Sequence, residues 1–330
     1  MAVTALGDRA ALFTAQRHNV QLRERLADLT GEMSTGRPSD MARHLRGDTA
    51  PLADLDRRLS QADSYGRAAS EAGTRLGAMQ IALAEAQGAR GDLAGTLITA
   101  TTGSGPTPGT GPAGEAAFGR VVMALNAQVA GGSLFAGTAT DGPALAPAQA
   151  MLADLRTALA GAATAGDVQA VLDAWFDDPM GGFATSGYQG NAGIIERPLD
   201  AGESVSLGVR ADDPSLRGLL KAAATAALAP TLGLPGGDTR TLLGQARDAL
   251  LSLTEPLSHV QASLGIAEGR AEEAQVRHAA RATAFGIQRA EMAEVDPFET
   301  ATTLEATRAQ LETQYALTRR LQSLSLARTL

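Results

Sequence analysis

The fold is decided by residues 243–295, which read LGQARDALLSLTEPLSHVQASLGIAEGRAEEAQVRHAARATAFGIQRAEMAEV. Mostly apolar or small residues recur there in alternating steps of three and four, the spacing of a helix that keeps one side against a partner helix. This seam runs through Leu243, Ala246, Leu250, Leu253, Leu257, Val260, Leu264, Ala267, Ala271, Ala274, His278, Arg281, Phe285, Gln288, Met292 and Val295. Such a helix spans on the order of 80 Å, more than a globular domain needs. Pro256 predicts a kink or a restart at Thr254.

Two helical segments with the same spacing lie in the first third of the chain. The longer one extends from Leu52 to Leu97. The shorter one precedes it and has one polar member, Asn19. Its seam residues are Leu12, Ala15, Asn19, Leu22, Leu26, Leu29 and Met33. The segment 31–40 (GEMSTGRPSD) contains two Gly, a Pro and residues that favour helix caps, and it predicts a break between the two helices.

The chain closes with a further amphipathic helix. Asp296, Pro297 and Glu299 form a capping-box pattern that predicts a helix start, and the helix is expected over 300–328. Because the first and last helices lie outside the main seams, we expect their apolar stripes to be unpaired in a single chain. These stripes predict an assembly interface. Its residues are Leu22, Leu26, Leu29, Met33, Leu304, Leu311, Tyr315, Leu321 and Leu324.

The middle of the chain has a different character. Residues 101–114 (TTGSGPTPGTGPAG) predict a solvated loop, and helix signals resume over 115–129. Shorter helices are expected at 148–159, 167–176 and 215–229. The segments 193–199 and 204–209 predict a β-hairpin, because Val205, Leu207 and Val209 alternate with small or polar residues.

These patterns predict a mainly α fold, with an elongated coiled-coil rod built from N- and C-terminal segments and a smaller inserted domain that contains the hairpin. The predicted division is 1–40 and 296–330 as terminal assembly helices, 41–136 and 238–295 as the rod, and 137–237 as the variable middle domain.

The composition excludes several kinds of chemistry. The chain has no Cys, which excludes disulfides, thiolate metal sites and a cysteine nucleophile. Its four His are isolated, no Gly-x-Ser-x-Gly elbow occurs, and the Gly-rich tract lacks the Gly-Lys-Ser/Thr ending of a phosphate-binding loop. The net charge of −8 opposes nonspecific binding of nucleic acid. We therefore expect no catalytic site, no metal and no cofactor.

Residues 1–20 contain Asp8, Arg9, Arg17 and His18, which interrupt any apolar run, so no cleaved signal peptide is expected. Membrane binding is not expected either, because the longest apolar stretch, 222–234, is broken by Pro230.

Four segments resemble the flagellin family. Residues 22–36 (LRERLADLTGEMSTG) are similar to its N-terminal helix and Ser-Gly break, and residues 296–330 are similar to its C-terminal helix. Residues 133–145 (SLFAGTATDGPAL) and 188–193 (YQGNAG) look more like the hook–filament junction members of the family than like filament flagellins.

This resemblance implies a structural, non-enzymatic subunit that is exported through the flagellar type III channel without a cleaved leader and joins hook to filament. The implied partners are a hook-side junction protein, flagellin, further copies of the chain in a ring, and an export chaperone on the C-terminal helix. A filament flagellin is the first alternative. A soluble, secreted helical adaptor is a second alternative from another class.

Overall fold

The computed structural model describes the backbone of residues 2–102 and 109–326, and the side chains of residues 13–102 and 109–320. Helices dominate it, and the described sheets have two strands each, so the predicted mainly α fold is confirmed. The chain divides into two compact units, residues 1–62 with 280–330 and residues 63–279. Two long helices, α3 (Ala50–Thr102) and α9 (Thr254–Ala293), contribute to both units.

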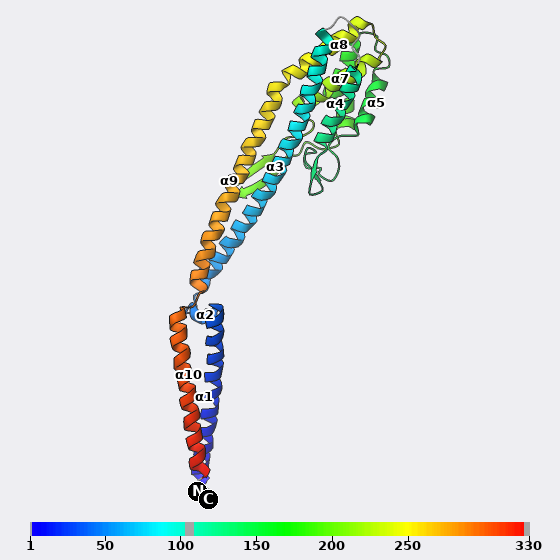
Figure 1. Cartoon of the computed structure of the whole chain (residues 1–330). Coiled ribbons are helices and arrows are strands. Elements are labelled where there is room, and N and C mark those ends of the chain that lie inside the picture. Colours follow the sequence, from blue (N-terminus) through cyan, green and yellow to red (C-terminus); the bar gives the residue numbers. More distant parts are fainter. Residues whose placement is uncertain (1, 103–108, 327–330) are drawn as a thin grey trace. The chain divides into compact units, whose positions relative to one another are not determined.

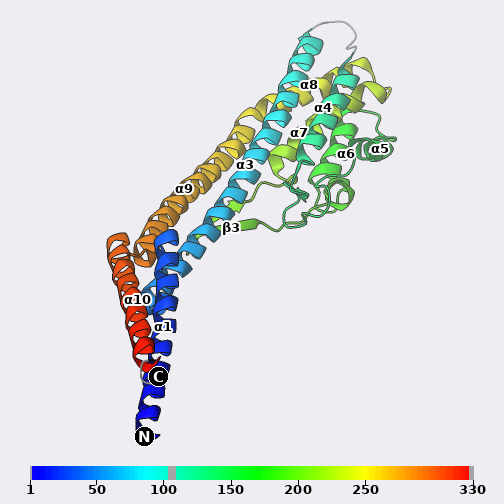
Figure 2. The same ribbon diagram turned by 60° about the horizontal axis from the view of Figure 1, so that its bottom comes forward.

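The first unit is built around the two ends of the chain. Helices α1 (Ala2–Thr35) and α10 (Pro297–Leu326) run antiparallel and lie side by side in both ribbon views (Figures 1 and 2). The short helix α2 (Met41–His44) follows α1, and Asp40 caps it by accepting a hydrogen bond from the Arg43 amide at 3.0 Å.

In the second unit, residues 63–102 of α3 run along residues 254–279 of α9 (Figure 1). The Gln80 side chain donates to the Gln261 carbonyl at 2.8 Å. Predicted seam residues are buried on both helices, which confirms the spacing argument. They include Leu76, Leu83, Leu93, Leu97, Leu257, Leu264, Ala271 and Ala274.

Shorter elements complete this unit. They are α4 (Thr110–Leu125), β1 (Gln128–Val129), β2 (Gly132–Ser133), α5 (Ala148–Ala158), α6 (Ala165–Asp177), a π-helical turn (Phe183–Gly187), β3 (Ile195–Asp200), β4 (Glu203–Leu207), α7 (Pro214–Leu228), a 3-10 turn (Ala229–Thr231) and α8 (Gly236–Ser252). Helix α7 is the centre of the core, since every residue from 222 to 228 is buried. Even so, no helix among the described residues has both the length and the apolar character needed to cross a bilayer.

Small residues allow α4 and α7 to approach closely. A Cβ added to Gly114 would lie 2.3 Å from the Ala227 backbone nitrogen and 2.7 Å from the Ala226 carbonyl carbon. No side chain fits there, so the two backbones touch. This contact accounts for the Ala- and Gly-rich composition of both helices.

Several element boundaries follow the sequence. Helix α9 restarts at Thr254, as Pro256 allows when it lies in a first turn. Asp213 caps α7 by accepting from the Ser215 amide at 2.8 Å, with Pro214 as the first helical residue. Asp296 caps α10 in the same way, since its Oδ1 accepts from the Phe298 amide at 2.8 Å.

Other element boundaries differ from those that the sequence predicts. Helix α1 continues through Gly31 and ends at Thr35, because the chain first enters the left-handed region at Gly36, with φ of 68°. The predicted loop 101–114 is too long, because α3 reaches Thr102 and α4 begins at Thr110. The start of α4 is helical because Thr110, Gly111 and Gly114 are buried, with both glycines against α7 or the turn that follows it. Residues 103–108 lie outside the described part of the chain.

The predicted hairpin is present and covers part of the long helices. Strands β3 and β4 pair antiparallel, and Leu199, Val205 and Leu207 are buried. His278 on α9 is buried on the seam, as predicted, and its Nε2 donates to the Leu199 carbonyl at 2.7 Å. Arg277 pairs with Glu203 at 2.6 Å, so neighbouring residues of α9 hold both strands.

Two of the segments that carry the family resemblance, 133–145 and 188–193, pack against each other. The Asn191 side-chain oxygen accepts from the Thr138 amide at 2.9 Å, and the Asn191 amide donates to the Ala136 carbonyl at 3.0 Å. Gly137, with φ of 65°, leaves no room for a side chain, because a Cβ there would lie 2.4 Å from the Asn191 carbonyl oxygen. The sequence pattern of both segments therefore belongs to one junction, in which residues 133–137 are buried and Thr138 and Asn191 are exposed.

Replacing Gly114 tests the close contact between α4 and α7. Gly114→Ala should destabilise the second unit by about 2 kcal/mol or more, because the backbones must separate. Trp175, the single Trp of the chain, lies in this unit and is 8% exposed, so its fluorescence reports thermal unfolding.

The matched control is Gly119→Ala on the same helix, where an added Cβ meets nothing within 4 Å. It should raise stability by up to about 1 kcal/mol, because Ala favours helix over Gly. Equal melting of Gly114→Ala and the wild type would contradict the contact.

Candidate assembly interface

The predicted interface residues of α1 partly cover α10 within the single chain. Leu22 and Leu29 are buried, at 6% and 8% exposure, and Leu26 is half-buried. Met33 remains 49% exposed. The two ends of the chain pair with each other, and we call the sides of α1 and α10 that face each other the inner seam. The expectation that both terminal stripes are unpaired in one chain is therefore wrong for this inner seam.

On α10 the most buried described side chains are two threonines that the apolar pattern did not indicate. Thr300 and Thr307 are 6% and 4% exposed, whereas Leu304 and Leu311 on the same side are half-buried. Each threonine hydroxyl donates to a backbone carbonyl four residues earlier, at 2.8 Å, which satisfies the buried polar group. The sequence contained one signal for their burial: the two threonines are seven residues apart and alternate with Leu304 and Leu311 along the helix.

Tyr315 lies beside the inner seam and bonds to α1. Its hydroxyl accepts a hydrogen bond from the Arg23 Nε at 2.9 Å, and the Arg23 guanidinium carbon lies 5.6 Å from the centre of the Tyr315 ring. Tyr315 is 42% exposed, so this contact also forms part of the surface. The side chains of Leu321 and Leu324, the two remaining predicted residues, lie outside the described residues.

A compact joint connects the end of α1 to the start of α10. The Val295 amide donates to the Gly36 carbonyl at 3.1 Å, which ties the chain after α9 to the end of α1. The Glu32 carboxylate accepts from the Ser39 amide at 2.8 Å and from the Ser39 hydroxyl at 2.7 Å. These two hydrogen bonds, with Ser39 as donor, lower the pKa of Glu32.

The pair retains exposed apolar side chains on its outer sides. Phe13 and Val20 are 65% and 53% exposed, and their separation of seven residues places them on one face of α1. Leu317 on α10 is 53% exposed. We call Phe13, Val20, Met33, Phe298, Tyr315 and Leu317 the outer apolar set. Its members are large side chains that are at least 42% exposed in the single chain.

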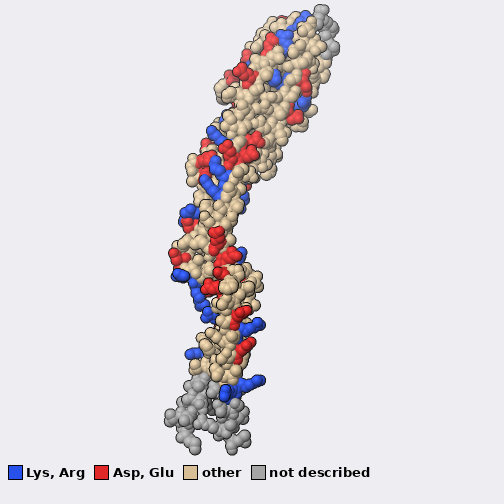
Figure 3. Space-filling model, turned by 60° about the vertical axis from the view of Figure 1, so that its left-hand side comes forward, with Lys and Arg blue, Asp and Glu red and all other residues tan. Residues whose placement is uncertain are grey.

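On the face drawn in Figure 3, basic and acidic side chains are mixed and lie among uncharged surface. Ion pairs in the first unit include Arg289 with Asp56, at 2.5 Å, and Arg58 with Asp54, at 2.6 Å. These pairs are largely solvent-exposed, so they add little stability.

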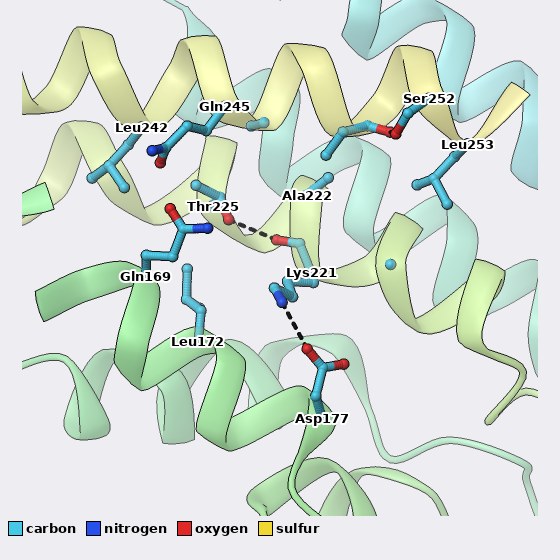
Figure 4. Close-up of a pocket in the computed structure, with 13 residues that line it drawn as sticks. Gln169, Leu172, Asp177, Lys221, Ala222, Thr225, Leu242, Gln245, Ser252 and Leu253 are labelled. Atoms are coloured by element: carbon cyan, nitrogen blue, oxygen red, sulfur yellow. Dashed lines mark hydrogen bonds and ion pairs between the residues drawn. The ribbon is translucent and has the colours of Figure 1, made fainter. Parts of the chain in front are cut away.

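A groove of about 260 Å³ lies between α6, α7 and α8 in the second unit (Figure 4). Lys221, the single Lys of the chain, lies at this groove and pairs with Asp173 and with Asp177, the latter at 2.7 Å. Burial opposes its charge, but the two carboxylates raise the pKa of Lys221 overall. The amine therefore stays protonated at neutral pH and is no nucleophile. No cluster of metal-binding side chains occurs among the described residues.

No family model matches the chain, and no curated protein sequence matches it. A solved structure does match it, a chain from Vibrio parahaemolyticus that is provisionally described as a flagellar hook-associated protein. The match has a TM-score of 0.52 and 12% sequence identity, and it covers 73% of this chain and 95% of that one. The two chains share a fold.

A charge in the inner seam should separate the terminal pair and leave the second unit intact. Leu29→Asp replaces a buried leucine with a carboxylate, which costs about 2–5 kcal/mol. Limited proteolysis should then remove residues 2–35 and 297–326 faster than in the wild type, while the Trp175 melt is unchanged.

The control is Leu264→Asp on α9, where the leucine is 2% exposed within the second unit. This variant should lower the Trp175 melting temperature. If Leu29→Asp lowers it as well, the terminal pair is part of the same cooperative unit.

Acid should loosen the joint. Because the pKa of Glu32 is lowered in the folded chain, its contribution to stability is present above the ordinary value of 4.5 and is lost as the pH falls through the folded value. Hydrogen exchange at the Ser39 amide should accelerate there relative to Glu32→Gln, which cannot titrate. Parallel pH profiles of the two proteins would show that the carboxylate does not hold the joint.

Proposed function

We propose that this chain is a non-enzymatic structural subunit of the bacterial flagellum that joins hook to filament, in the manner of hook-associated protein 3. The observation that carries the proposal is the terminal helix pair with its outer apolar set, on a fold shared with the Vibrio chain described as hook-associated. The flagellin-like motifs at both ends support it.

Assembly would use the terminal pair as the contact element. Burying the outer apolar set against neighbouring subunits gains about 25 cal/mol for each Å² removed from water. No single side chain of the set gives a stable contact, but repeated contacts around a ring add together. The neighbours would be further copies, a hook-side junction protein and flagellin, with an export chaperone on α10 before assembly.

The proposed location is outside the cell, at the junction of hook and filament, after export through the flagellar type III channel. Immunogold labelling of isolated flagella tests it directly. A narrow band at the distal end of the hook supports the junction role. Label along the whole filament would assign the chain to the filament flagellins, and the absence of label from flagella would favour the secreted adaptor.

A variant of the outer apolar set tests the mechanism. Leu317→Asp should abolish or reduce swimming at least about tenfold, because a carboxylate in a packed contact is costly to desolvate. The purified variant should melt like the wild type, since Leu317 is exposed in the single chain. Leu317→Met keeps an apolar side chain of similar volume and should swim normally. Normal swimming of Leu317→Asp would remove this residue from the interface.

A further inference from the structure

The connections that join α1 to α3 and α9 to α10 differ in length and in burial. Residues 36–49 lie between α1 and α3, and none of them is buried. Residues 294–296 lie between α9 and α10, and Val295 among them is 8% exposed. Since three residues span at most about 10 Å, the start of α10 is held close to the end of α9. Helix α1 has a longer connection without a buried side chain.

The apolar residues of α1 fit more than one axial position, or register, against α10. They recur in steps of three and four. A shift of α1 by four residues, about one helical turn, therefore brings Leu22 and Leu29 to the present levels of Leu26 and Met33. The two buried threonines of α10 do not select one register either, because each hydroxyl donates to a carbonyl of its own helix.

Polar groups act on this register in both directions. Arg23 donates to the Tyr315 hydroxyl at 2.9 Å, and the Val295 amide donates to the Gly36 carbonyl at 3.1 Å, so both contacts favour the register in the structure. The Asn19 side-chain oxygen opposes it. This oxygen is buried and accepts no hydrogen bond from any described residue, which costs stability.

A shift of α1 toward its C-terminal end would give the Asn19 oxygen a donor. Asn19 precedes Arg23 by four residues, so a shift of about one turn places it on nearly the same face at the present level of Arg23, opposite Tyr315. The Tyr315 hydroxyl accepts from Arg23 in the structure, and a phenol can also donate one hydrogen bond. The shift breaks the contacts of Arg23 and Gly36, so the shifted register is the minor one.

We propose that α1 slides along α10 between two registers. One is the register in the structure, which Arg23 stabilises, and the other is shifted by about one turn toward the C-terminal end of α1, where the Tyr315 hydroxyl donates to Asn19. Residues 36–49 take up the displacement, whereas the three-residue connection keeps α10 beside the end of α9. This motion belongs to the single chain and does not depend on the proposed function.

The chain has no Cys, so spin labels on introduced cysteines can report the register in the purified protein. Gln16→Cys and Glu305→Cys label exposed positions of α1 and α10. Counted from the contact of Arg23 with Tyr315, these positions are roughly 25 Å apart along the pair, and sliding shortens that separation by about 5 Å. Double electron–electron resonance should therefore show a main distance and a minor, shorter one. Labels on Glu291→Cys and Glu305→Cys span the three-residue connection and should give one distance.

Two substitutions four residues apart should change the populations in opposite directions. Arg23→Met removes a contact that favours the register in the structure and should raise the shorter-distance population about tenfold or more. Asn19→Leu removes the unsatisfied oxygen from that register and the acceptor from the shifted one, so it should lower this population by a similar factor. Arg25→Met, at an exposed position of the same helix, is the control and should leave both populations unchanged.

Trp175 fluorescence verifies that the second unit is folded in each protein. A single, unshortened distance in Arg23→Met would overturn the inference. A broad distribution of longer distances in this variant would also overturn it, because the helices would then separate instead of sliding. A change in the distance from Glu291 to Glu305 would show that α10 moves, which contradicts the assignment of the motion to α1.

Discussion

The pairing of α1 with α10 is the contact on which the first unit depends. Arg23 and Tyr315 are separated by 292 positions in the sequence, yet they share a hydrogen bond, and the Gly36 carbonyl accepts from the Val295 amide at the other end of the pair. These contacts bring the two ends of the chain together. The middle of the chain is consequently an insertion between the first and last helices.

The two units differ in how completely they bury their side chains. In the second unit α7 is enclosed from residue 222 to residue 228, and seam leucines such as Leu76 and Leu97 have no exposed surface. In the terminal pair, half-buried leucines such as Leu304 and Leu311 alternate with buried threonines. Segments that exchange partners are drawn from the less stable parts of a protein. The lower burial of the terminal pair is therefore consistent with its proposed role as a contact element, and the higher burial of the second unit with a scaffold.

Most helices could be predicted because their seams keep a regular apolar spacing, and the caps at Asp213 and Asp296 fixed their starts. The misses have physical causes. Gly and Pro at the start of α4 indicate a loop, yet Gly114 is required there by the close approach of Ala227. An apolar pattern does not indicate Thr300 and Thr307, because threonine is polar. They can be buried since each hydroxyl donates to a carbonyl of its own helix. Pairing between the two ends could not be predicted from either stripe alone, since each stripe fits many partners.

The order in which the chain is synthesised determines when α1 and α10 can pair. Every residue of the second unit, 63–279, precedes α10, so this unit can complete its core while the last helix is still being synthesised. Helix α1 precedes the second unit in the chain and α10 follows it, so their contact joins residues that are far apart in sequence, and such contacts are slow to form by chain diffusion. During that interval α1 has no intramolecular partner, and a factor that binds early helices would meet it in its unpaired form.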